Sequence, residues 1–175
     1  WDYTLVATTD SLPGIDATWR CTTVPFRPDQ HDKLFIGPPD VRVAGRLWLR
    51  THFTLSLEAA TQAVDLHCER VNDRCLVVVN GQRVAENSEG WSPFSVPLGR
   101  AVRAGENELM LGVTGGDGGT AVSHRPIGLP WFYGGFKGVP LPLHLETHAL
   151  LAIEEVAIET HLLGGSRLVS RVTVR

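Results

Sequence analysis

The stretch LVVVNGQRV (Leu76 to Val84) carries the strongest fold signal in the sequence. An apolar run ends at Asn80-Gly81, and polar and apolar side chains alternate after it. Asn-Gly between two such runs is typical of a type I′ turn, because both residues tolerate the positive φ that this turn requires. The stretch therefore predicts a β-hairpin in the middle of the chain.

The segments around this hairpin also read as strands. LWLRTHFTLSL (47–57) and QAVDLHCERV (62–71) alternate with a period of two, and ELMLGVTG (108–115) follows a turn-forming RAGEN. VPLPLHLETH (139–148) is a further run, which its two prolines restrict to a sheet edge or a bulge. No window keeps helical periodicity, and 18 Gly and 11 Pro separate the runs, so the sequence predicts an all-β sandwich.

Composition narrows the function classes. The 175 residues suit about one domain, and 43% hydrophobic residues suffice for a buried core. A net charge of −3, without long runs of like charge, argues against nucleic acid and anionic membranes as partners. No apolar stretch approaches the ~20 residues needed to span a bilayer. The chain starts at Trp1 without a signal-peptide pattern, so we expect it to be excised from a longer protein, with a cytoplasmic location favoured.

The three cysteines, Cys21, Cys68 and Cys75, are odd in number and match no metal-ligand spacing. Cys68 alternates with Asp65, His67 and Glu69, which suits a small buried residue on the inner face of a strand. A Cys68–Cys75 disulfide is the alternative, and it requires an oxidising compartment. We expect free thiols, no metal site and no cofactor.

The C-terminal segment differs from the rest. Residues 149–175 hold two expected strands, 153–160 and 167–174, joined through Gly164-Gly165. Two strands cannot bury a core by themselves. We therefore expect one domain over residues 1–148 and the truncated beginning of another over residues 149–175.

Three passages together resemble one known pattern. GRLWLRTHFTL (45–55) places an aromatic, an Arg and a Phe on one strand. The passage from VVVNGQRV to GENELMLGV (77–113) joins Asn-Gly, a Gly-aromatic pair, Pro-Phe and a turn close to AGEN. WFYGGFKGVPLPLHL (131–145) has Gly-Gly-aromatic before a last strand. Their order and spacing resemble the N-terminal sugar-binding domain of family 2 glycoside hydrolases, the group of β-galactosidases, β-glucuronidases and β-mannosidases.

The resemblance implies a galactose-binding-like jelly roll, followed by the first strands of an immunoglobulin-like sandwich. It implies a non-catalytic sugar-binding-type domain that packs on the catalytic barrel and helps to shape its substrate pocket. The partners would be that barrel and the immunoglobulin-like domain of the parent chain. In the family both catalytic carboxylates lie on the barrel, which alone needs ~250 residues, so we expect no catalytic residue in this chain. Whether the parent protein is an enzyme then depends on residues outside this chain.

Candidate ligand-binding residues come from aromatic and glycine-rich segments. Trp131 and Tyr133 in GLPWFYGGFKG could stack on sugar C–H surfaces, or Trp131 could fill the core. Trp91 in EGWSPF could likewise stack on a sugar, or it could fill the core or a contact between domains. Asp117 lies in TGGDGGTAVSHRP (114–126), a loop that in relatives approaches the mouth of the barrel. The seven histidines are scattered, with His144 and His148 on one side of a strand.

The sequence is also compatible with two other functions. A free-standing carbohydrate-binding module would bind glycan through exposed aromatics, and an adhesion-type sandwich would be purely structural. Carbohydrate and a second copy of the chain are therefore further partners to test. We expect the apolar tail to pack on its own sandwich or to pair with a neighbouring chain.

Overall fold

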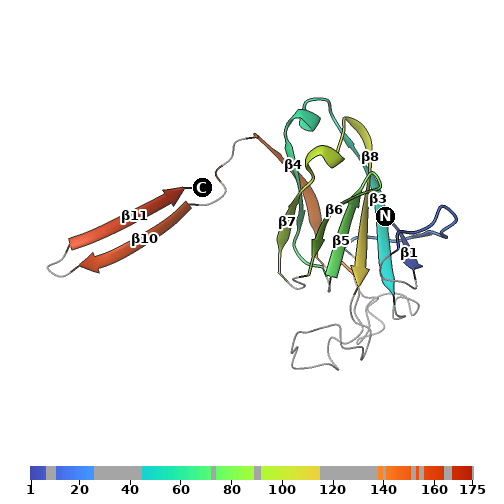
Figure 1. Cartoon of the computed structure of the whole chain (residues 1–175), viewed down its shortest axis with the longest axis horizontal. Helices are drawn as coiled ribbons and strands as arrows, with labels where there is room; N and C mark the ends of the chain where they lie inside the picture. Colours follow the sequence, from blue (N-terminus) through green and yellow to red (C-terminus); the bar gives the residue numbers. More distant parts are fainter. Residues whose placement is uncertain are drawn as a thin grey trace, which may run out of the picture.

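The protein is a sandwich of two antiparallel sheets followed by a separate hairpin (Figure 1). The structure, a computed structural model, describes residues 1–6, 11–25, 45–71, 74–88, 92–114, 138–139, 141–150, 153, 156–163 and 167–174. In these ranges helical structure is limited to the short 3₁₀ turns η2 (Ala59–Thr61) and η3 (Gly99–Ala101). The predicted all-β sandwich is confirmed.

The larger layer is a six-stranded sheet in the order β2–β1–β3–β8–β5–β6. The smaller layer is a three-stranded sheet in the order β7–β4–β9. The strands of the larger sheet are β1 (Asp2–Val6), β2 (Arg20–Cys21), β3 (Arg46–Leu55), β5 (Arg74–Val79), β6 (Gln82–Asn87) and β8 (Gly105–Thr114). Those of the smaller sheet are β4 (Ala63–Cys68), β7 (Phe94–Pro97) and β9 (Leu143–His148).

The main core lies between the two layers. Alternate residues of each strand point inward, because successive side chains of a strand face opposite sides of the sheet. The larger sheet contributes the buried Leu47, Leu49, Val77, Val79, Leu109, Leu111 and Val113, and the smaller sheet contributes Val64, Leu66, Cys68 and Val96. The alternation that we predicted for residues 62–71 is confirmed, since β4 alternates between buried and partly exposed positions.

The predicted turn at Asn80-Gly81 joins β5 to β6. Asn80 has φ 51° and Gly81 has φ 78°, as a type I′ turn demands. The strands pair from Val79 with Gln82, with a shift of register between Val77 and Val78. The hairpin prediction is confirmed, and the bulge is an addition that no local sequence signal announced.

The cysteines are free thiols in the structure, as predicted. Cys68 and Cys75 are buried, whereas Cys21 is exposed on β2. Burial raises the pKa of the Cys68 thiol to about 12 and raises that of Cys75 well above its usual value. Both buried thiols therefore stay protonated and act as small apolar residues of the core.

The C-terminal hairpin pairs β10 (Val156–Leu163) with β11 (Arg167–Val174). Figure 1 shows the hairpin apart from the sandwich. The side chains of Val156, Ile158 and Val172 are exposed. Of the two arrangements expected for the tail, packing on its own sandwich is wrong, and pairing with a neighbouring chain stays a prediction. The predicted boundary after residue 148 stays a prediction. None of the described residues forms a helix long and apolar enough to cross a membrane.

Candidate functional site

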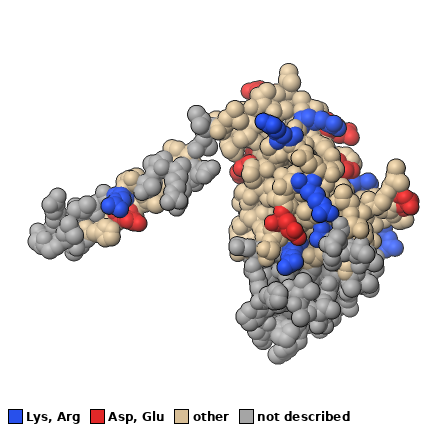
Figure 2. All heavy atoms as spheres, viewed as in Figure 1, with Lys and Arg blue, Asp and Glu red and all other residues tan. Residues whose placement is uncertain are grey.

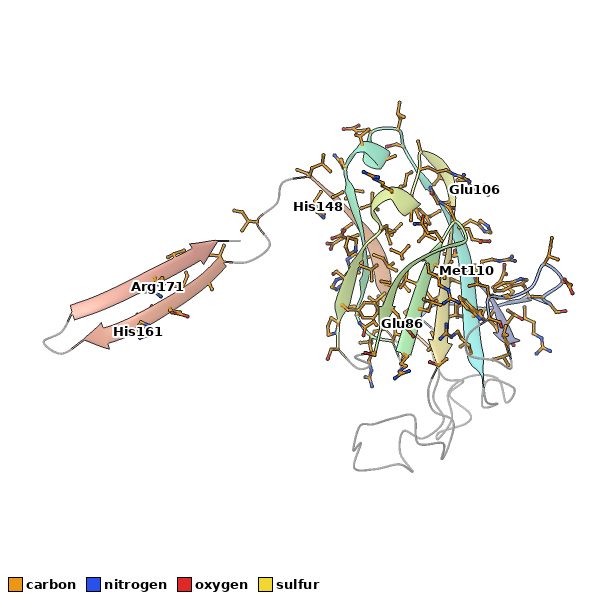
Figure 3. All side chains as sticks on the ribbon, in the orientation of Figure 1. Glu86, Glu106, Met110, His148, His161 and Arg171 are labelled. Carbon is orange, nitrogen blue, oxygen red and sulfur yellow. The ribbon has the colours of Figure 1, made fainter. Side chains whose placement is uncertain are left out.

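The outer side of the three-stranded sheet gathers a group of ionisable side chains. We call it the histidine face and define it by seven residues: Asp65, His67 and Glu69 on or beside β4, Ser95 on β7, and His144, Glu146 and His148 on β9. Strand alternation turns their neighbours Val64, Leu66 and Cys68 into the core, so these polar residues must face outward. Figure 3 shows His148 at the end of β9, where the chain leaves the sandwich.

The register of the sheet brings these residues together. β4 lies between β7 and β9, so His67 is directly opposite Ser95 on one side and His144 on the other. His67 Nδ1 lies 2.9 Å from Ser95 Oγ, and the ring centroids of His67 and His144 are 4.9 Å apart. From the sequence we placed only His144 and His148 on one side of a strand. His67 was not grouped with them, because the pairing of β4 with β9 joins segments that are distant in the chain.

Each β9 histidine has a carboxylate partner. His144 Nε2 lies 2.9 Å from Glu146 Oε1, and this hydrogen bond lowers the pKa of Glu146. His148 Nδ1 donates to the Ala149 carbonyl at 2.9 Å, and its Nε2 lies 3.2 Å from Asp65 Oδ2. The Ala149 carbonyl and then Asp65 raise the pKa of His148, because both interactions favour the imidazolium.

The outer side of the larger sheet carries a second, mostly apolar cluster. Trp48, Leu76, Val78 and Met110 are buried there, with Trp19 packed against them. Gly112 lies opposite Trp48 and has no side chain, which leaves room for Trp48 and for the stem of Arg46. Figure 3 shows Glu86 and Met110 on this sheet. The second cluster was not predicted. A sandwich core explains why one side of β3 is apolar, but it does not explain why the opposite side is also buried.

Two arginines border this second cluster. Arg50 lies over the Trp19 ring, 4.1 Å from its centroid, and pairs with Asp2 at 3.3 Å. Arg46 reaches Glu86 at 3.9 Å. These contacts hold the N-terminal segment and β6 to the sheet, so their main effect is structural. Figure 2 shows acidic and basic groups interspersed over the visible side of the sandwich.

The predicted ligand-binding residues Trp91, Asp117, Trp131 and Tyr133 lie outside the described residues. The two glutamates near the start of β8 are among the described residues. Glu106 is exposed and Glu108 partly exposed on β8, and Glu108 lies 3.6 Å from His52. The described ranges hold no group of three His, Cys, Asp or Glu side chains arranged to bind a metal ion.

Comparison with solved structures gives the fold a family context. The β-glucuronidase of an uncultured Clostridium species matches the whole chain with a TM-score of 0.67 at 16% identity, and the chain covers 32% of that protein. The β-glucuronidase of Faecalibacterium prausnitzii matches 99% of the chain with a TM-score of 0.65 at 20% identity, over 34% of its length. A family 2 glycosyl hydrolase from Bacteroides cellulosilyticus matches 91% of the chain with a TM-score of 0.58 at 16% identity, over 22% of its length.

This is the sandwich fold of family 2 glycoside hydrolases. Among curated proteins, a β-glucuronidase of Formosa agariphila is 29% identical over 101 residues, which is 54% of this chain and 10% of that protein. No known family profile matches the sequence. The chain thus spans about a tenth of its curated relative and about a third of the first two solved structures named above. The resemblance to family 2 glycoside hydrolases is confirmed.

Proposed function

We propose that this chain is the non-catalytic sugar-binding-type domain of a family 2 glycoside hydrolase that acts on β-glucuronides. The observation that carries the proposal is the match of the whole chain to about a third of β-glucuronidase structures. The curated relative bears the same activity in its name. A domain of this kind packs on the catalytic barrel and completes the wall of the substrate pocket with its loops.

The placement of the described carboxylates supports a non-catalytic role. A retaining glycosidase needs two carboxyl groups ~5–5.5 Å apart beside the bound sugar. Asp65 and Glu146 are cross-strand neighbours, but each lies on an open sheet surface and is partnered by a histidine. The hydrogen bond from His144 lowers the pKa of Glu146, whereas a general acid needs a raised pKa.

In this proposal residues 1–148 form the sugar-binding-type sandwich and residues 149–175 begin an immunoglobulin-like domain. The exposed apolar side chains of Val156, Ile158 and Val172 support the second assignment, because a hairpin with such a face needs further strands to cover it. The barrel and the remaining immunoglobulin-like strands are then the partners within the parent chain.

The test compares the isolated chain with the product of the whole gene. We expect no turnover of nitrophenyl β-glucuronide, β-galactoside or β-mannoside by the isolated chain, and turnover of the glucuronide by a parent that carries a barrel-sized extension. Turnover by the isolated chain, abolished by replacing one of its own carboxylates, would contradict the proposal. Micromolar binding of a simple sugar to the isolated chain in a calorimetric titration would instead favour a free-standing carbohydrate-binding module.

The aromatic candidates are tested in the parent enzyme. Trp131→Ala and Tyr133→Ala should raise KM for the glucuronide, because a stacking platform is lost. Ile15→Ala is the control, since Ile15 is fully exposed and not aromatic. Unchanged KM in both aromatic variants would remove these residues from the substrate pocket.

A further inference from the structure

His67 and His144 are the central pair of the histidine face. They are direct partners in the pairing of β4 with β9, and residues opposite each other in an antiparallel pair have Cβ atoms about 5 Å apart. Their ring centroids are 4.9 Å apart and the ring planes are inclined by 44°. Both rings are partly exposed, so an ion from solvent can reach them.

The hydrogen-bond partners of the two rings select which nitrogen carries the proton. Glu146 Oε1 can only accept, so His144 Nε2 donates to it and the neutral ring keeps its lone pair on Nδ1. His67 Nδ1 lies 2.9 Å from Ser95 Oγ and its Nε2 lies 3.7 Å from Glu69 Oε1, so when Nδ1 donates to the hydroxyl oxygen the lone pair on Nε2 lies beside that carboxylate. A carboxylate or hydroxyl on the far nitrogen is the usual arrangement behind a metal-binding imidazole, because it orients the ring and raises its basicity.

From this geometry we propose that His67 and His144 together chelate a divalent transition-metal ion of the zinc class across β4 and β9. Two imidazoles that bind one ion at about 2 Å hold their centroids about 5 Å apart, which is the separation seen in the sheet. Imidazole nitrogen suits Zn²⁺, Ni²⁺ and Cu²⁺. The described part of the chain holds no group of three His, Cys, Asp or Glu side chains arranged to bind a metal ion, so water completes the coordination shell, with Glu69 Oε1 3.7 Å from His67 Nε2.

The surroundings favour a cation. Asp65, Glu69 and Glu146 lie on the same face, each within 3.7 Å of a histidine nitrogen, and a group of carboxylates attracts a metal cation. The bound ion would also fasten β9, an edge strand of the smaller sheet, to the central strand β4. Binding to the folded state alone then raises the unfolding temperature.

The experiment uses the whole 175-residue chain, prepared without a polyhistidine tag and stripped with a chelator. ZnCl₂ is titrated by calorimetry near neutral pH, and thermal unfolding is followed with and without the ion. We expect about one equivalent to bind and the unfolding temperature to rise with zinc. His67→Gln and His144→Gln should each weaken binding more than about tenfold, since loss of an outer partner alone costs 10–100-fold.

His52→Gln and His161→Gln are matched controls, because each removes an exposed histidine that lies beside a glutamate elsewhere in the chain. Both should bind zinc as the unchanged protein does. The proposal is overturned if His67→Gln and His144→Gln bind as tightly as the controls, or if the controls lose as much affinity. Circular dichroism of each variant establishes folding, and histidine ring resonances report independently whether zinc shifts His67 and His144 together.

Discussion

Asn80 and Asn107 show how single side chains can fix a turn against the rest of a sheet. Asn80 Nδ2 donates to the Ala101 carbonyl at 2.8 Å and to Asn107 Oδ1 at 2.9 Å, and Asn80 Oδ1 accepts from the Glu108 amide at 3.0 Å. Asn107 is 1% exposed and also bonds backbone groups of Arg103. Asn80 and Asn107 therefore act beyond their own turns, because their side chains form one hydrogen-bonded network.

Replacing Asn107 should be costly. Asn107→Ala leaves several partly buried donors and acceptors without this partner, at the low end of about 1–3 kcal/mol for each group, so we expect a loss of about 3 kcal/mol in the free energy of unfolding. Urea denaturation followed by fluorescence measures it. Glu106→Ala is the control, because Glu106 is exposed on the same strand and its loss should change stability by less than about 0.5 kcal/mol. Equal losses in the two variants would mean that the network contributes nothing.

At the scale of elements, the pairing of β3 with β8 depends on a missing side chain. A Cβ at Gly112 would lie 2.7 Å from Arg46 Cδ and 2.8 Å from Trp48 Cη2. Gly112→Ala should therefore destabilise the sandwich by about 1–3 kcal/mol, because both large side chains must move. Thermal unfolding checks this value. Trp48→Leu in the Gly112→Ala background should recover part of the loss, and a double variant no more stable than the single one would contradict the steric account.

The edge strand β9 should respond to pH through His148. Its pKa is raised by the Ala149 carbonyl and by Asp65, with Glu146 also nearby, so its stabilising contribution is complete below about pH 6.5 and is lost as the pH rises through the folded-state pKa. His148→Gln should remove this part of the fall in stability as the pH rises above about 6.5. Asp65→Asn should remove only a portion, because the Ala149 carbonyl remains. Parallel stability-against-pH curves for all three proteins would refute the assignment.

The elements predicted from the sequence were those specified by local pattern. Asn80-Gly81, the alternation of Val64, Leu66 and Cys68, and the restriction of the VPLPLHLETH run to an edge all arise from neighbouring residues, and all are present. The histidine face was missed because His67 and His144 meet only after β4 pairs with β9. Long-range register leaves no trace in a single sequence, whereas turn chemistry and alternation do.

At the scale of the whole molecule, the β10–β11 hairpin lies apart from the sandwich in Figure 1. Among the described residues, those of the main core and those packed against it lie between Trp1 and Leu145, so removal of residues 150–175 should leave the sandwich folded with an unchanged cooperative transition. We keep Ala149, because its carbonyl accepts from His148. Calorimetry checks the transition. A truncated chain that fails to fold would show that the boundary lies further along.

Light scattering of the same pair of proteins tests the hairpin as a contact surface. Val156, Ile158 and Val172 expose an apolar surface that a second copy could cover in the isolated chain. If the full chain self-associates, the truncated chain should be monomeric. A dimer that persists after truncation would place the contact on the sandwich instead.

The polar network at Asn80 and Asn107 also affects which backbone amides of the sheet exchange their protons first. A hairpin tip is ordinarily the first part of a sheet to exchange its amide protons with deuterium, since few contacts hold it. Here the Asn80 amide donates to the Glu108 carbonyl at 2.9 Å, and the Glu108 and Arg103 amides are held by the two asparagine side chains. We therefore expect these three protons to exchange only when the sandwich opens as a unit. Their protection should match that of the central strands, which makes this turn a late part of the fold to open.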